Sequence, residues 1–440
     1  VVDPCSKSRT CHDVLPKLYE SYGLSYDQIL EGVEYMGNEY EKIIEIFNHQ
    51  VNIKYPLDTS TTHFDCTNFY FEIDKEDEFR KKGPSKENRH DPIIGLGLLL
   101  DANQIPIGMK LYPGNESEKP VIRDIIKELK EHNQISGKTV RVADKGINCA
   151  ENIIDALKNN DGYLFSKSVK QLPETEKTWV LLKDGYKKVT DSNGTLLYLI
   201  KECIDEFPYT YTDEYGKKHT VRLKEKRVAT YNPKLSEKKK YEIKKMVEKA
   251  KMLKACQAKK SEFGECSKYV TFGCADKKGN AIDGKVKVEI NRDAILKDLK
   301  LAGYNLLVTS EIKMKADDIY STYHNLWRIE ESFKVMKSYL DARPVFLQKT
   351  ASIHGHFLIC YLAVLLIRLL QFKVLKNKYC TEKLIKFIRE FRIVKLEPNK
   401  YVNITPSSKF IKSLSAELKL PITNYFLNES QIKKMLNYKF

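Results

Sequence analysis

The chain has 440 residues, with 75 Lys and Arg against 59 Asp and Glu, and its formal net charge is +16. This length can bury a large core in two or three domains, and the basic surplus favours a polyanionic partner, most often nucleic acid. The longest apolar run, Phe357 to Leu370, contains Arg368 and is shorter than the roughly 20 residues of a membrane span, so we expect a core helix and no membrane.

The ten cysteines show no paired spacing that suggests a disulfide framework, and no charged-then-apolar signal segment opens the chain. A reducing cytoplasm is therefore the expected compartment. The first residue is Val rather than Met, which leaves open that an upstream domain is missing. Residues 1–58 have helical apolar spacing, and we expect a helical N-terminal segment that is the remnant of a longer DNA-binding region.

After this segment the apolar period changes from helical to strand-like. β-Branched and aromatic residues predict three strands, then a helix, a strand, a second helix and another strand. The first strand contains Asp65, and the next two begin at Pro92 and Ile105. The first helix follows Ser117, and the fourth strand ends at Asp144. The second helix begins at Glu151 and the last strand at Gly162. Together they predict a mixed α/β sheet flanked by helices.

Residues 168–300 break this pattern and are expected to form an inserted, largely β domain that contains one Lys-rich helix. Between Lys234 and Lys260 there are 11 Lys and 3 Glu, which is too one-sided for balanced pairing along a helix. We favour a surface that faces phosphates, and a merely solvated helix is the alternative. Apolar periodicity returns over residues 301–373, and residues 374–440 are basic and helix-prone.

Residues 323–339, YHNLWRIEESFKVMKSY, predict one amphipathic helix. At about 100° per residue its buried stripe is formed by Leu326, Ile329, Phe333, Met336 and Leu340. Tyr323, Glu330 and Lys337 follow one another at intervals of seven along the edge of that stripe. We therefore expect Glu330 to be half-sheltered and Glu331 to be exposed, although an ordinary surface charge pair is an alternative reading of this spacing.

Three acids lie where burying a charged side chain would be energetically unfavourable. Asp65 lies inside an apolar strand, Asp144 at the end of another and Glu330 at the border of a buried face. If they converge, their repulsion would raise their pKa values, and a divalent cation would relieve it. Carboxylate oxygens suit Mg²⁺ or Mn²⁺, and two such ions support in-line displacement at phosphorus. Each acid taken singly is more often a structural residue.

The segments HFDCTNFYFE, VADKGI and Y-x2-L-W-x-I-E-x2-F-x3-K resemble the three acidic motifs of DDE insertion-sequence transposases that carry the Y-R-E-K signature. The resemblance spans about residues 60–372. It implies an RNase H-like catalytic domain formed by residues 59–167 and 301–373, interrupted by the insertion.

The resemblance also implies roles for single residues. Asp65, Asp144 and Glu330 would be catalytic and would hold two Mg²⁺ or Mn²⁺ ions, and Tyr323 and Lys337 would contact DNA phosphates. The arginine of the signature falls at Leu326, which belongs to the buried stripe and supplies no cation.

The implied function is that of a transposase that binds the ends of its own DNA element and catalyses metal-dependent phosphodiester hydrolysis and strand transfer. Its partners would be double-stranded element ends and target DNA, its active form a homodimer, and its location the cytoplasm at the bacterial nucleoid. Two alternatives remain: an RNase H-like nuclease without strand transfer, and a non-catalytic DNA-binding remnant of a transposase.

Overall fold

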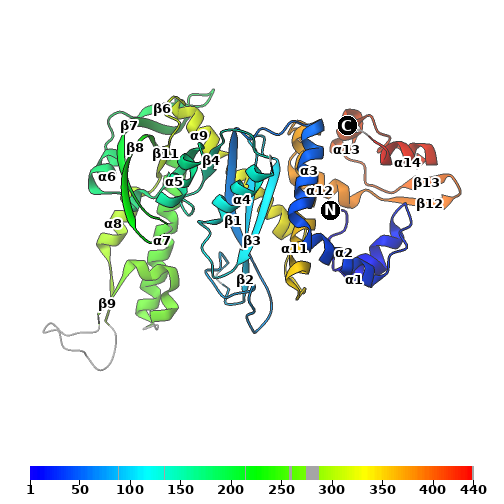
Figure 1. The fold of residues 1–440 in the computed structure, drawn as a ribbon, viewed down its shortest axis with the longest axis horizontal. Coiled ribbons are helices and arrows are strands. Elements are labelled where there is room, and N and C mark those ends of the chain that lie inside the picture. Colours follow the sequence, from blue (N-terminus) through cyan, green and yellow to red (C-terminus); the bar gives the residue numbers. More distant parts are fainter. Residues whose placement is uncertain (88, 133, 214, 257–259, 274–286, 439–440) are drawn as a thin grey trace. The chain divides into compact units, whose positions relative to one another are not determined.

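The structure is a computed structural model that describes the chain apart from residues 88, 133, 214, 257–259, 274–286 and 439–440 (Figure 1). It divides into two compact units. The first comprises Val1–Asp161 and His324–Phe440, and the second comprises Gly162–Tyr323. The second unit is therefore an insertion in the sequence of the first. The predicted mixed α/β architecture, a sheet flanked by helices, is confirmed.

The first half of the first unit contains short N-terminal helices, two longer helices, and an α/β sheet. Its elements are α1 (Lys7–Arg9), η1 (Thr10–Val14), η2 (Leu15–Lys17), α2 (Tyr26–Asn38), α3 (Tyr40–Lys54), β1 (Thr61–Tyr70), β2 (Ile93–Leu100), β3 (Pro106–Pro113), α4 (Val121–Glu131), β4 (Val140–Ala143) and α5 (Ala150–Lys158). The strands and helices expected from β1 to α5 are all present.

The second half of the first unit is mainly helical. Its elements are α10 (Trp327–Lys334), η5 (Val335–Tyr339), α11 (Thr350–Arg368), η6 (Leu369–Val374), α12 (Thr381–Glu390), β12 (Ile393–Glu397), β13 (Lys400–Asn403), α13 (Lys409–Leu418), β14 (Phe426–Leu427) and α14 (Glu429–Leu436). The C-terminal region is thus helical as expected, but it also contains a small antiparallel sheet in the order β12-β13-β14.

In the first unit the strand order is β3-β2-β1-β4. β1 pairs antiparallel with β2 and parallel with β4, and β2 pairs antiparallel with β3. Nearly every residue of β2 and β3 is buried, because helices cover both faces of these strands. The central position of β1 follows from its run of β-branched and aromatic residues, which is typical of a strand that packs on both sides.

The two faces of β1 contact different helices. On one face Phe64 lies close to Val121 of α4, and Gly97 of β2 leaves the room for this contact. On the other face the ring of Phe69 lies 4.6 Å from that of Phe357 in α11. Side chains alternate along a strand, so Asp65, four residues before Phe69, points to the face covered by α11.

The helix α11 forms the centre of the largest core cluster, together with β1, β2, α10 and η5. Among the described residues, Thr350–Val374 is long and apolar enough to cross a membrane by length and composition, and just over half of its most apolar window is buried. The expectation that this segment is too short to do so was wrong, because the helix continues through η6 beyond the apolar run.

The helices α2 and α11 approach each other closely at two glycines. A Cβ atom added at Gly355 would lie 1.8 Å from the carbonyl oxygen of Val33, and one added at Gly37 would lie 1.7 Å from that of Ala351. Only residues without a side chain fit at this crossing. The sequence of α2 is therefore adapted to rest on α11.

The second unit contains five main strands together with helices. Its elements are β5 (Gly162–Lys167), η3 (Val169–Gln171), α6 (Glu174–Leu181), β6 (Lys187–Thr190), β7 (Leu196–Thr212), β8 (Lys218–Tyr231), α7 (Pro233–Ala255), η4 (Lys260–Tyr269), β9 (Val270–Gly273), β10 (Lys287–Ile290), α8 (Arg292–Leu301), β11 (Tyr304–Thr309) and α9 (Ala316–His324). The order of its main strands is β5-β11-β8-β7-β6, and β9 pairs with β10 separately. The expected Lys-rich helix is α7.

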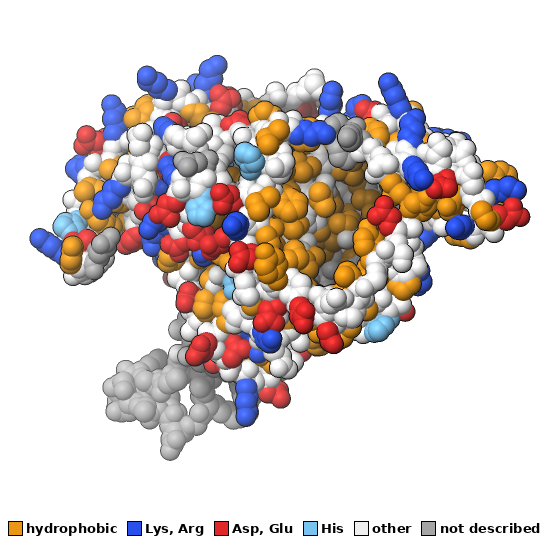
Figure 2. All heavy atoms as spheres, turned by 45° about the vertical axis from the view of Figure 1, so that its right-hand side comes forward, with side chains coloured by type: hydrophobic (Ala, Val, Ile, Leu, Met, Phe, Trp, Pro, Cys, Tyr) orange, Lys and Arg blue, Asp and Glu red, His pale blue; other side chains and the backbone are white. Residues whose placement is uncertain are grey.

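The molecule also exposes large apolar side chains. Figure 2 shows one face, on which hydrophobic side chains line a hollow while Lys and Arg side chains project along the upper edge. Exposed apolar residues of α11 include Ile359 and Leu366.

We predict that Gly355→Ala lowers the free energy of unfolding by about 1–3 kcal/mol, because the added methyl group forces α2 away from α11. Gly32→Ala in α2 is the matched control, since nothing lies within 4 Å of its added Cβ and the change favours the helix. Thermal or denaturant unfolding measures both. Equal stability of the two variants would contradict the close crossing.

Candidate active site

Asp65 and Asp144 lie side by side on adjacent parallel strands. The register pairs Phe64 of β1 with Ala143 of β4, and each of these residues is followed directly by one of the acids. Neighbouring strands lie about 4.8 Å apart, and residues paired in register point to the same face. The two carboxylates therefore share one face of the sheet, at the carboxyl end of β4.

Both carboxylates are fixed by neighbouring backbone groups. The Oδ1 atom of Asp65 accepts a hydrogen bond from the backbone N–H of Cys66 at 2.7 Å, and the Oδ1 atom of Asp144 accepts one from Lys145 at 2.5 Å. The backbone carbonyl of Asp144 accepts from Ile147 in the turn that follows β4. Local backbone groups thus help to orient both side chains.

The electrostatic surroundings of Asp65 favour a bound cation. Burial, together with the nearby negative charges of Asp144 and Glu118, raises its pKa to about 6, although Lys86 and the Cys66 N–H oppose the rise. A carboxyl group with a raised pKa beside a second carboxylate is the arrangement in which a divalent cation most relieves repulsion. Asp144 thus contributes to the raised pKa of Asp65.

Two further charged residues near Asp65 escaped the sequence analysis. The Lys86 ammonium donates to the backbone carbonyl of Cys66 and forms an ion pair with Glu118 at 3.2 Å. Lys86 comes from the loop between β1 and β2, and Glu118 from the turn that precedes α4. Loop residues have no periodicity that would mark their position, so no local signal in the sequence identifies them.

Glu330 lies in the first turn of α10, and α10 packs beside β1. The apolar stripe is as predicted, because Ile329, Phe333 and Met336 are buried in the core cluster with α11. This packing brings the helix that carries Glu330 to the strand that carries Asp65. The side chain of Glu330 itself is exposed.

The predicted environments of the two adjacent glutamates are therefore reversed. Glu330 is exposed rather than half-sheltered, and Glu331 is partly buried and fully paired rather than exposed. The predicted single helix over residues 323–339 is also interrupted, because α9 ends at His324 and α10 begins at Trp327. The reversal itself arises because the buried side of this helix extends through Ser332 and Val335 toward Glu331, where Arg368 and Thr381 cover it.

Glu331 holds α10 to the C-terminal region through a polar network. Its carboxylate accepts hydrogen bonds from Arg328 at 3.1 Å, Arg368 at 3.2 Å and Thr381 at 2.9 Å. The guanidinium of Arg368 is fully buried and also donates to the Ser332 hydroxyl. Burial alone would raise the pKa of Glu331, but its three partners lower it below the ordinary value.

The two predicted DNA contacts occupy different units. Tyr323 is the last residue of the second unit, whereas Lys337 lies in η5 of the first. The Lys337 Nζ atom is 3.1 Å from Glu87 and 5.2 Å from the centroid of the Phe69 ring. η5 is a π-helix, a type of turn that is frequent at functional sites, and it turns Lys337 toward β1.

A hollow of ≈ 240 Å³ lies between β1, β3 and the loop after β4. It is bounded by Tyr112, Glu118 and Gly146, the last of which follows Asp144 and Lys145. Tyr112 covers Gly95 so closely that a Cβ atom there would lie 2.0 Å from the ring. The hollow thus connects the loop after β4 with the turn that carries Glu118.

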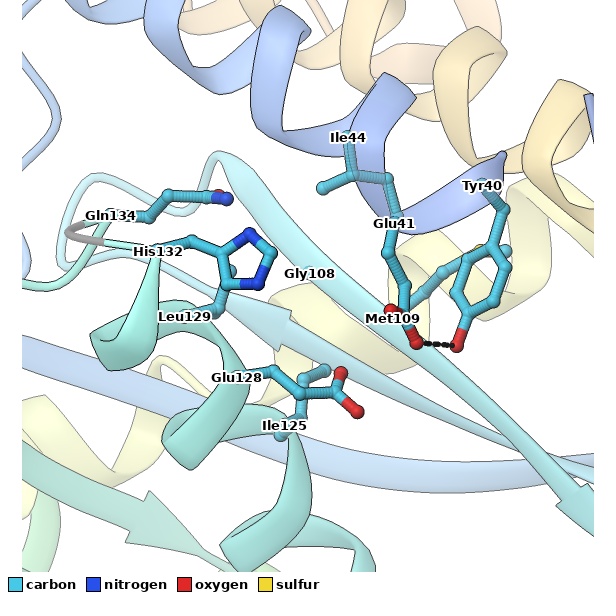
Figure 3. Close-up of a pocket in the computed structure, with 10 residues that line it drawn as sticks. All are labelled: Tyr40, Glu41, Ile44, Gly108, Met109, Ile125, Glu128, Leu129, His132 and Gln134. Atoms are coloured by element: carbon cyan, nitrogen blue, oxygen red, sulfur yellow. Dashed lines mark hydrogen bonds between the residues drawn. The ribbon is translucent and has the colours of Figure 1, made fainter. Parts of the chain in front are cut away.

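A second cavity lies between α3, β3 and α4 and differs in kind. Figure 3 shows Glu41 and Glu128 directed toward each other, with the Tyr40 hydroxyl donating to Glu41 at 2.7 Å. Lys110 forms ion pairs with both carboxylates. The space amounts to ≈ 30 Å³, about one water molecule, so this cavity is not a substrate site.

The donor set fits a hard divalent cation in part. Asp65 and Asp144 supply adjacent carboxylate oxygens, which are the ligands that Mg²⁺ prefers. In the described part of the chain, however, no three His, Cys, Asp or Glu side chains form a ready metal cluster. The exposed side chain of Glu330 is free to rotate about its own bonds, whereas the two aspartates are already in place.

Comparison with known proteins identifies one match. The family model described as "Transposase DDE domain" matches residues 59–366, well over half of the chain. Both aspartates and Glu330 fall within the matched range. The mixed sheet flanked by helices is consistent with an RNase H-like domain of this kind. No curated protein matches the chain.

We predict that Glu331→Gln lowers the free energy of unfolding by about 2–4 kcal/mol at pH 7, because it leaves Arg368 buried without a counter-charge. The lowered pKa of Glu331 makes its contribution fully present above about pH 4.5, the ordinary value, and lost as the pH falls through the folded-state pKa. The difference between the two proteins should therefore shrink in acid. Denaturant unfolding across pH measures it.

Glu330→Gln is the matched control for this experiment, since it removes the same charge from the adjacent, exposed position. It should change stability by no more than about 0.5 kcal/mol. A loss as large as that of Glu331→Gln would contradict the assignment of the two environments.

Proposed function

The chain belongs to the DDE transposase family, and from this premise we propose that it binds the ends of its own DNA element, cleaves them and joins them to target DNA. Members of this family are nucleic-acid-cleaving enzymes that act on DNA and generally use divalent metal ions. The observation that carries the proposal is the register of β1 and β4, which sets Asp65 beside Asp144.

We propose that Asp65, Asp144 and Glu330 are the catalytic residues and that they hold Mg²⁺ or Mn²⁺, as two ions. The bound metal would supply activation of the attacking hydroxyl and stabilisation of the leaving oxygen at phosphorus. Asp65 and Asp144 form the fixed part of the site, because their backbone hydrogen bonds orient them. Glu330 supplies the third carboxylate from α10, which packs on β1.

The half-burial of Asp65 has a role in this scheme. It keeps the carboxylate away from bulk water, so that a cation and a phosphate there interact in a medium of lowered dielectric constant. Lys86 partly offsets the negative charge of the aspartate pair. It would limit repulsion between the acids and the DNA backbone before a metal ion binds.

The Y-R-E-K signature belongs to the proposal with one change. We propose that Tyr323 and Lys337 contact phosphates near the element end. The position of the signature arginine holds Leu326, which is partly buried against the core cluster and has no charge to offer. Whether the chain carries the whole signature depends on which cation replaces this arginine.

The remaining assignments follow from the same premise. Joining two element ends to one target favours a homodimer as the active form, and DNA rather than a membrane as the partner, in the cytoplasm at the bacterial nucleoid. A nuclease without strand transfer would also use the paired aspartates. Joining of a precut element end to target DNA separates the two functions.

The Lys-rich helix α7 provides a second DNA contact in this proposal. Lys234, Lys238, Lys245 and Lys249 are exposed and lie within about 60° of one another on the helix surface. The stripe is about 22 Å long, and the exposed ring of Tyr241 lies within it. A row of cations of this length suits the phosphate backbone of a duplex.

We predict that Asp65→Asn, Asp144→Asn and Glu330→Gln each abolish Mg²⁺-dependent cleavage of the flanking element ends while DNA binding measured without metal stays within about threefold. The reason is that each amide loses the charge that a divalent ion requires. Asp124→Asn, an exposed acid in α4, serves as the control and should cleave normally. Full cleavage by either aspartate variant would remove the basis of the proposal.

We predict that replacing Lys238, Lys245 and Lys249 together by Gln reduces the salt dependence of DNA binding by about two to three phosphate contacts, as measured by the slope of log affinity against log salt. The control replaces Lys240, Lys244 and Lys251, which are equally exposed but lie on another side of α7. Because the net charge changes equally, the same slope for both variants would indicate a merely solvated helix.

A further inference from the structure

Glu87 joins two cations of the first unit in a partly buried cluster. Its Oε1 atom is 3.1 Å from the Nζ atom of Lys337, and its Oε2 atom forms an ion pair with Arg343. The side chain of Lys337 is 13% exposed, that of Glu87 28% and that of Arg343 23%. One carboxylate is thus held by two cations in a place of limited access to water.

Aromatic residues of β1 support both cations. Lys337 lies over the ring of Phe69 at 5.2 Å, and Arg343 lies over the ring of Tyr70 at 5.5 Å. Such cation–π contacts restrict where the charged groups sit. The cluster is therefore built on the same strand that carries Asp65, at its opposite end.

The distance between this cluster and the acids matches a stretch of DNA backbone. Asp65 and Phe69 are four residues apart, or about 13 Å along the strand. Glu330 and Lys337 are seven residues apart, or about 10 Å along the helix. Because a B-form strand rises about 3.4 Å per nucleotide, the cluster is about three to four nucleotides from the acids.

We propose that Lys337 and Arg343 form a phosphate-binding site about three to four nucleotides from the scissile phosphate, and that the Glu87 carboxylate fills it until DNA takes its place. This inference rests on the proposed function, which provides the scissile phosphate. Arg343, in the segment between η5 and α11, thereby supplies the cation that Leu326 cannot supply.

The chemistry of the cluster suits an exchange of anions. A carboxylate and a phosphate are both oxyanions that accept charge-assisted hydrogen bonds from Lys and Arg, and the Arg fork fits either. Burial alone would raise the pKa of Glu87, but Arg343 and Lys337 lower it, so Glu87 stays charged and holds the site at neutral pH. Two cations against one carboxylate leave one positive charge uncompensated.

The Glu87 side chain can move away from the two cations without a change in the fold. Glu87 lies in a turn of the connection between β1 and β2, outside any strand or helix. Its neighbour Lys86 pairs with Glu118 at the acids. Displacement of the Glu87 side chain would therefore require rotation about its own bonds and no rearrangement of the sheet.

The test compares DNA binding of Glu87→Gln, Glu78→Gln and the unchanged chain in EDTA, with a duplex of the gene's own flanking sequence as the probe. Glu78 is an exposed carboxylate in the same loop, so it matches the charge change. We expect Glu87→Gln to bind about tenfold more tightly, since no carboxylate competes with phosphate, and Glu78→Gln to bind within about twofold of the unchanged chain.

Arg343→Gln identifies the site directly. It should weaken binding and reduce the gain from Glu87→Gln when the two changes are combined, because one of the two cations for which carboxylate and phosphate compete is then absent. If Glu87→Gln does not fold, Glu87→Asp, with a shorter reach, should give a smaller gain of the same sign.

Glu87 is a structural ion-pair residue, and the proposal is wrong, if the Gln variant folds but binds DNA equally or more weakly. The same conclusion follows if the gain is undiminished in the variant that also lacks Arg343. If the unchanged chain still cleaves the DNA element ends, these outcomes do not affect the proposed function. Failure of the unchanged chain to bind or cut DNA would instead overturn the proposed function.

Discussion

The parallel pairing of β1 with β4 is the constraint on which the candidate site depends. Because side chains alternate along a strand, a slip of one residue in this register would send Asp144 to the opposite face from Asp65. The register is held at the start of β4 by Arg141, whose buried guanidinium binds the carboxylates of Asp155 and Asp161. The Asp161 carboxylate also accepts the backbone N–H of Thr139.

The charges of the first unit fall into two kinds with different consequences. Arg141 and Arg368 are buried and surrounded by acceptors, and they fix elements whose backbone would otherwise be free to shift. Asp65 is half-buried, yet its nearest charges include acids as well as Lys86. The two arginines are paired with acceptors of the chain itself. The negative charge around Asp65 is only partly balanced, so a bound cation can stabilise it.

The sheet, its helices and the pair of aspartates could be predicted, because strand composition and the order of elements are local properties of the sequence. The environments of Glu330 and Glu331 could not, since Arg368 and Thr381 cover only the Glu331 side of α10 and come from distant parts of the chain. Contacts made by loops, such as those of Lys86 and Glu87, depend on tertiary packing alone. The apolar stripe was right because it lies within α10 and η5.

The link between Glu331, Arg368 and Thr381 has a consequence for how related chains can diverge. A buried arginine tolerates neither loss of its carboxylate nor replacement by a group of another shape, so single changes at these positions are costly and paired changes are not. Position 331 should therefore co-vary with positions 368 and 381 among homologues, whereas the proposed function predicts that Glu330 stays constant. Sequence variation at position 331 would then reflect packing, whereas conservation at position 330 would reflect the proposed catalysis.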